Sequence, residues 1–211
     1  MLISEPPIQI IRTGKAAAQA PGAQVIQGEP TLFVSTTSVY TWLYNDSGSG
    51  ASMDVTLYRP APTDISYSIL GDYAQGNYSN PTGTSLIVKA INDDPNFPLI
   101  KLPIDYSEVW DDKGSGGNHD GSVWFPVPPD GYISIGFVGQ TGYSKPSLQN
   151  YACLRRDLCV DAAPGQLIWN DRNSGAHGDI SIYQIVGVPG SFVAQSNYNP
   201  YIGPCHKLAG N

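Results

Sequence analysis

The chain has 211 residues, a length that suits one large all-β domain or two small ones. Its 23 glycines and 18 prolines interrupt helices and favour turns between short strands. The net charge of −7, from 11 basic and 18 acidic residues, opposes binding to nucleic acids and to anionic membranes. We therefore expect no nucleic-acid partner.

The sequence also lacks the signals of membrane insertion and of secretion. No apolar run approaches the roughly 20 residues that a spanning helix needs, so we expect no transmembrane segment. The N-terminal segment has acid and proline where a signal peptide needs a basic start and an apolar block. These features predict a soluble chain of unknown location, with extracellular action after release as one option.

Residues 1–28 are rich in Ala, Gln, Pro and Gly. We interpret them as an N-terminal arm that lies on the surface or is partly disordered. The rest of the chain, 29–211, is predicted to be one domain.

An internal repeat organises this domain. Three segments align without a gap: Tyr44–Tyr58, Trp110–Trp124 and Trp169–Tyr183. They share an aromatic residue, Asn or Asp, Asp, then Gly or Asn, Ser and Gly, and later Asp, Ser or Thr, an aliphatic and an aromatic residue. The match continues downstream to Tyr-containing turns that end at Pro81, Pro146 and Pro200. Repeats of this kind predict stacked copies of one unit, here at about 29–95, 96–160 and a shorter 161–211.

Each copy reads as about four short strands. In the second copy these are 104–110, 121–126, 132–138 and 148–154, in which apolar and polar residues alternate between turn residues. Three such sheets can bury their apolar faces only against one another. The sequence therefore predicts a β-prism of three four-stranded antiparallel sheets with a pseudo-threefold repeat. A three-bladed closed arrangement and a β-trefoil are the alternatives, although trefoil repeats are usually shorter.

The cysteines match no zinc-site spacing. Cys153 and Cys205 fall on the last strands of their copies, which lie on different sheets, so we expect both of them and Cys159 to be free. Arg155 and Arg156 could lower a thiol pKa, but packing of the cysteines in strands is the favoured interpretation.

The same motifs resemble a known family. The runs Trp169–Tyr183, Trp124–Gly136 and Tyr151–Leu158 are similar to the vacuolar protein sorting-associated protein sixty-two family, over about Thr31 to Leu208. The resemblance implies a β-prism and carries no defined enzymatic activity. It also links the chain to β-prism modules that target some insecticidal pore-forming proteins to membranes or glycans.

A G-x-x-x-D segment occurs once in each copy and is similar to the sugar-binding loop of jacalin-like lectins. The candidate ligand-binding residues are Gly50, Asp54, Gly116, Asp120, Gly175 and Asp179. Glycine lets the backbone approach a ligand, a carboxylate accepts hydrogen bonds from two sugar hydroxyls, and an aromatic ring can pack on the sugar. Turn bracing by the same aspartates is the competing interpretation, and threefold repetition fits both.

A second set of aspartates, Asp46, Asp112 and Asp171, lies eight residues before the first. With the preceding Asn45, Asp111 and Asn170 they could bind calcium or open the loop as Asx-turns. We favour Asx-turns, because calcium sites usually carry denser carboxylates at alternating positions. No metal or cofactor is expected.

No catalytic arrangement stands out, and Trp110, Trp124 and Trp169 suit core packing more than ligand stacking. We expect a non-enzymatic recognition module whose partner is a glycan or glycoconjugate receptor. The alternative is an insecticidal or pore-forming toxin component that binds a membrane or a protein receptor, together with a pore-forming partner protein. A purely structural module is the third interpretation.

Overall fold

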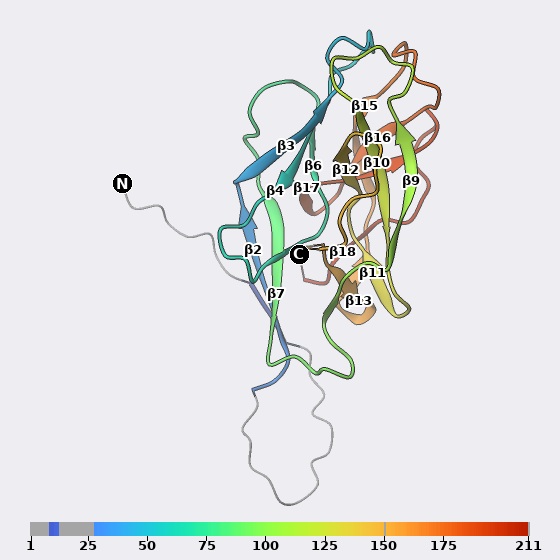
Figure 1. The fold of residues 1–211 in the computed structure, drawn as a ribbon. Coiled ribbons are helices and arrows are strands. Elements are labelled where there is room, and N and C mark those ends of the chain that lie inside the picture. The colour runs from blue at the N-terminus through green and yellow to red at the C-terminus, as the bar shows by residue number, and fades with distance from the viewer. Residues whose placement is uncertain (1–8, 13–27, 150, 211) are drawn as a thin grey trace, which may run out of the picture.

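Strands make up almost all of the regular structure in the computed structural model, which describes residues 9–12, 28–149 and 151–210 (Figure 1). The one helical element in these residues is a short 3-10 turn, η1 (Arg156–Leu158). The described part of the chain thus holds no helix with the length and apolarity to cross a bilayer. The predicted all-β class is confirmed.

Each copy of the repeat contributes an antiparallel group of three strands that flanks its motif loop. The groups are β3 (Tyr40–Asn45), β4 (Thr56–Pro60) and β6 (Tyr73–Gln75) in the first copy, β9 (Asp105–Asp111), β10 (Gly121–Val127) and β12 (Val138–Thr141) in the second, and β15 (Pro164–Asn170), β16 (Ser181–Ile185) and β17 (Val188–Gln195) in the third. β-Branched and aromatic residues dominate the central strands, as the pleated surface favours.

A second set of strand pairs also recurs in each copy. The pairs are β2 (Thr31–Thr37) with β7 (Ser85–Ile91), β8 (Ile100–Lys101) with β13 (Cys153–Arg155), and β14 (Cys159–Asp161) with β18 (His206–Leu208). β5 (Ser68–Ile69) joins β7, and β11 (Tyr132–Ser134) joins β13. The same connection pattern in three copies is the pseudo-threefold repeat of a β-prism.

The division into sheets differs from the prediction of three four-stranded sheets. The described strands form sheets of four, three, three, two and six strands. The predicted third strand breaks in the first two copies where Gly71 and Gly136 meet, since a Cβ on Gly71 would lie 2.7 Å from the Gly136 Cα. A bridge between Ser191 and Tyr73 joins the strand groups of the third and first copies into the six-stranded sheet.

The structure describes only residues 9–12 and 28 of the predicted N-terminal arm. Gln9–Arg12 form β1, which pairs antiparallel with β2 at the edge of the first copy. The other predicted arm residues, apart from Gly28, lie outside the described residues. The division of 29–211 into repeats at the predicted boundaries stays a prediction.

Side chains from all three copies meet in one core. Its largest fully buried members include Leu57 from the first copy, Leu154 from the second, and Trp169, Ile182 and Phe192 from the third. Burying each large apolar side chain contributes roughly 1.5–3 kcal/mol. The copies therefore stabilise one another, as the closed prism requires.

A buried ionic network ties the first copy to the second. Asp72 is fully buried and accepts hydrogen bonds from the Tyr151 hydroxyl at 2.8 Å and the Gly139 amide at 2.9 Å. Arg59 lies 3.4 Å from the Asp72 carboxylate and donates from Nε to the Tyr151 hydroxyl at 2.6 Å. Burial raises the pKa of Asp72 to about 6, and the nearby Arg59 charge opposes that rise.

Asp72→Ala should lower the free energy of unfolding by about 3 kcal/mol, because it leaves Arg59 and Tyr151 without their buried acceptor. Urea denaturation at pH 7 measures the change. Asp105→Ala is the matched control, since Asp105 pairs with Lys145 on an exposed surface and should unfold near the parent midpoint. Equal losses in the two variants would contradict a special role for the buried network.

Candidate functional site

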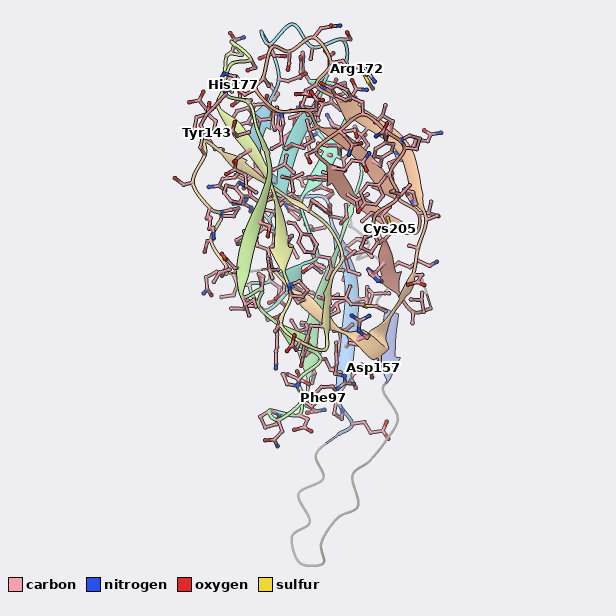
Figure 2. The ribbon with its side chains drawn as sticks, turned by 90° about the vertical axis from the view of Figure 1, so that its right-hand side faces the viewer. Phe97, Tyr143, Asp157, Arg172, His177 and Cys205 are labelled. Carbon is pink, nitrogen blue, oxygen red and sulfur yellow. The ribbon has the colours of Figure 1, made fainter. Side chains whose placement is uncertain are left out.

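The three motif loops lie together at one end of the prism, at the top of Figure 1. They are residues 46–55, 112–120 and 171–180, which join β3 to β4, β9 to β10 and β15 to β16. Figure 2 shows Tyr143, Arg172 and His177 at this end and Phe97 and Asp157 near the other. The fold thus brings together residues more than a hundred positions apart in the chain.

Backbone hydrogen bonds link each loop to the next around a closed ring. One amide of each loop donates to a carbonyl of its neighbour: Asn118 to Ser47 at 2.8 Å, His177 to Lys113 at 2.9 Å and Ser52 to Arg172 at 3.0 Å. The ring gives the three loops a shared, fixed geometry.

The first aromatic residues of the three motifs pack together in the core. Trp110 contacts Tyr44 and Trp169 edge to face, with ring centroids 6.1 and 5.5 Å apart. All three rings are buried, which confirms the predicted packing role of Trp110 and Trp169. Trp124, on β10, is also buried.

We name Asp46, Asp112 and Asp171 the inner aspartates. The indole Nε1 of Trp169 donates to Asp46 at 2.9 Å, and that of Trp110 donates to Asp171 at 3.0 Å, so each bond joins two copies. Each inner carboxylate also accepts the backbone amide nine residues later, from Val55, Gly121 and Ile180.

These bonds give the inner aspartates a bracing role. All three are at most 3% exposed. Burial raises the pKa of Asp46, while the hydrogen bonds it accepts act in the opposite direction. Tyr44 has no indole N–H, so Asp112 of the second copy lacks the indole donor from another copy that Asp46 and Asp171 have. The Ser115 hydroxyl lies 3.4 Å from the Asp112 carboxylate.

Other polar positions of the motif also hold the loop backbone. The side-chain oxygens of Asn45, Asp111 and Asn170 accept the amide two residues later, as in Asx-turns, and so do the hydroxyls of Ser49, Ser115 and Ser174. The hydroxyls of Thr56, Ser122 and Ser181 donate to carbonyls of the following turn. The contacts of Asn45, Asp111 and Asn170 agree with the predicted Asx-turns.

We name Asp54, Asp120 and Asp179 the outer aspartates. All three are exposed, and no backbone amide of the described residues donates to their carboxylates within hydrogen-bonding distance. The bracing that sequence reasoning assigned to them as an alternative is carried by the inner aspartates. The predicted glycines Gly50, Gly116 and Gly175 are exposed as well, with φ of +78°, +68° and +80°.

A tyrosine links the inner and outer aspartates of each copy. These loop tyrosines are Tyr78, Tyr143 and Tyr198. Tyr78 donates to Asp46 at 3.0 Å and Tyr198 to Asp171 at 2.9 Å. Each phenol also interacts with its outer aspartate: Asp54, Asp120 and Asp179 respectively.

The phenols stay protonated because their surroundings disfavour the phenolate. Partial burial and the two nearby carboxylates raise the pKa of Tyr78, Tyr143 and Tyr198 well above the usual value. Each copy therefore presents an outer carboxylate that accepts hydrogen bonds beside an aromatic ring. The tyrosines were not among the predicted site residues, although their recurrence three or two positions before Pro81, Pro146 and Pro200 was the available signal.

Comparison with known proteins places this geometry in a family. The model of vacuolar protein sorting-associated protein 62 (Vps62) matches residues 7–194. The chain belongs to the Vps62 family. A search of curated proteins gives no match.

A solved structure shares the fold of this Vps62 family member. The crystal structure of GNIP1Aa from Chromobacterium piscinae matches with a TM-score of 0.66 at 31% sequence identity. The match covers 79% of this chain and 33% of that one. The chain thus spans about a third of the length of the protein it matches.

The three cysteines are free, as predicted. Figure 2 shows Cys205 away from the loop end. Burial raises the pKa of Cys153 to about 11. The pKa of Cys159 rises to about 12, because burial and the charge of Asp157 outweigh Arg156. Arg155 does not activate a thiol but pairs with Asp157 at 2.7 Å.

Asp171→Ala should lower the free energy of unfolding by about 2–3 kcal/mol, because the Ile180 amide and the Trp110 indole lose a buried charged acceptor. Asp179→Ala, eight residues later in the same loop, should leave the unfolding midpoint near that of the parent. Thermal and urea denaturation of both variants measure this. The reverse order of effects would show that the outer aspartates are the braces.

Cys153 and Cys159 should react slowly with a thiol reagent at pH 8 in the folded protein. Their raised pKa values leave almost no thiolate at that pH, and the fraction should grow only as the pH rises toward 11. Ellman titration should find all three thiols after denaturation without a reductant. Rapid native labelling of either cysteine at pH 8 would contradict the burial.

Proposed function

We propose that the chain is a non-enzymatic recognition module that binds glycans through the loop end of the prism. One observation carries the proposal. In each copy the inner aspartate and the Asn, Asp, Ser and Thr positions of the motif hold the backbone, whereas the outer aspartate is exposed and accepts no amide from the described backbone. A residue type repeated three times without a bracing contact is the best candidate for contact with a ligand.

The chemistry of the outer aspartates suits sugar hydroxyls. A carboxylate can accept hydrogen bonds from two neighbouring hydroxyls, and bonds to a charged acceptor are the stronger ones. The adjacent loop tyrosine offers an apolar ring face to the C–H side of a sugar. The positive φ of Gly50, Gly116 and Gly175 favours glycine, so each loop has exposed backbone without a side chain four residues before its outer aspartate.

Membership of the Vps62 family and the GNIP1Aa match support a β-prism protein and leave its ligand to be tested. A second candidate function follows from the length of that relative. GNIP1Aa carries the shared fold as about a third of a longer chain, which favours a targeting role beside other domains. In that case the loop end would bind a membrane or a protein receptor for a pore-forming toxin.

The triple variant Asp54→Asn, Asp120→Asn and Asp179→Asn should lose glycan-array binding while its melting temperature stays near that of the parent. Asparagine keeps the size of the side chain but removes the charged acceptor. Asp130→Asn, at an exposed turn outside the loops, is the control and should bind like the parent.

Two results would reject the glycan proposal. One is an unchanged glycan profile for the triple variant, and the other is no glycan binding by the parent protein. Binding of the parent to liposomes or insect cells without glycan binding would favour the toxin-component function.

A further inference from the structure

The three loop sites are not equivalent, although their motifs align. The difference lies three residues after the first aromatic of the motif, where the first copy has Ser47, the second Lys113 and the third Arg172. In the second copy the Lys113 ammonium lies 4.4 Å from the centroid of the Tyr143 ring. In the third copy the Arg172 guanidinium lies 4.2 Å from the centroid of the Tyr198 ring.

These two cations occupy a ring face that a sugar would need. A cation over an aromatic face is stabilised by the ring quadrupole by roughly 0.5–1 kcal/mol at exposed sites, and a ligand must displace it. Lys113 is also held by an ion pair with Asp111. Tyr143 and Tyr198 are half-buried.

In the first copy, no cation of the described residues covers the loop tyrosine. Ser47 is too short to reach over a ring, and its hydroxyl donates to Asn45 at 2.8 Å instead. Tyr78 is 45% exposed, and no cation of the described residues lies over its ring. The outer Asp54 beside it is exposed too.

Charge narrows the class of ligand at this open site. Tyr78 interacts with both carboxylates of its copy, Asp46 and Asp54, and the whole chain carries a charge of −7. Sialylated or sulfated glycans would be repelled by these groups. A neutral sugar is not repelled by these carboxylates, and its hydroxyls can still donate hydrogen bonds to them.

We propose that the first copy alone carries a working site, that it takes a neutral hexose, and that Lys113 and Arg172 close the sites of the second and third copies. This inference rests on the proposed glycan function. It assigns Tyr78 as the ring platform and Asp54 as the hydroxyl acceptor. The residue at positions 47, 113 and 172 then sets how many sugars each chain binds.

Exchanging the residues at these positions tests the assignment. The probes are methyl α-mannoside and methyl β-galactoside, measured by calorimetry with NMR mapping of the contacted residues. The parent should bind one of these hexosides at one site per chain. Ser47→Lys should weaken that binding at least about tenfold. Lys113→Ser with Arg172→Ser should raise the number of sites from one toward three.

Ser47 in the first copy shows that the motif tolerates serine at the position equivalent to 113 and 172. Melting temperatures equal to that of the parent would verify that all variants fold. Lys101→Ser is the control, because it removes a cation from a tyrosine ring outside the motif loops and should add no site. Three sites in the parent, or unchanged binding by Ser47→Lys, would overturn this inference and leave the glycan proposal standing. No hexoside or array binding by the parent or by the opened variant would reject both.

Discussion

The hydrogen bond from a tryptophan indole to the inner aspartate of another copy is the interaction on which the loop end depends. Trp169 reaches Asp46, and Trp110 reaches Asp171, so two of the three joints between copies are made by a buried charged acceptor. Bonds of this type are directional and stronger than neutral ones. They hold neighbouring copies together beneath the loops, and the backbone bonds between the loops add a second set of links.

The inner and the outer aspartate of each loop have different roles. Each inner aspartate accepts a backbone amide, and Asp46 and Asp171 also accept an indole and a phenol, so their loss should cost stability. The outer aspartates lie in the same loops, exposed and held only through a tyrosine. A stiff loop with an unbraced carboxylate is preorganised for binding, because little conformational entropy remains to be lost when a ligand arrives.

The repeat made much of this predictable, because aligned motifs and alternating strands depend on local sequence. The first two strands predicted for the second copy, the burial of the tryptophans and the free cysteines followed from such patterns. The choice between Asp46 and Asp54 as the brace did not, since the Trp169 donor is more than a hundred residues away in sequence. The break of the third strand likewise depends on contact between Gly71 and Gly136 of different copies. The contacts of Lys113 with Tyr143 and of Arg172 with Tyr198 are cation–π contacts that the alignment alone does not reveal.

The central claim is that the loop end binds sugar through an exposed aspartate and its tyrosine. A crystal structure of the protein soaked with a neutral methyl hexoside tests it most directly. The account predicts the sugar against the Tyr78 ring, with two of its hydroxyls on the Asp54 carboxylate, and no sugar over Tyr143 or Tyr198. A sugar held elsewhere, such as in the cavity of about 480 Å³ between Tyr73 and Val186, would contradict it.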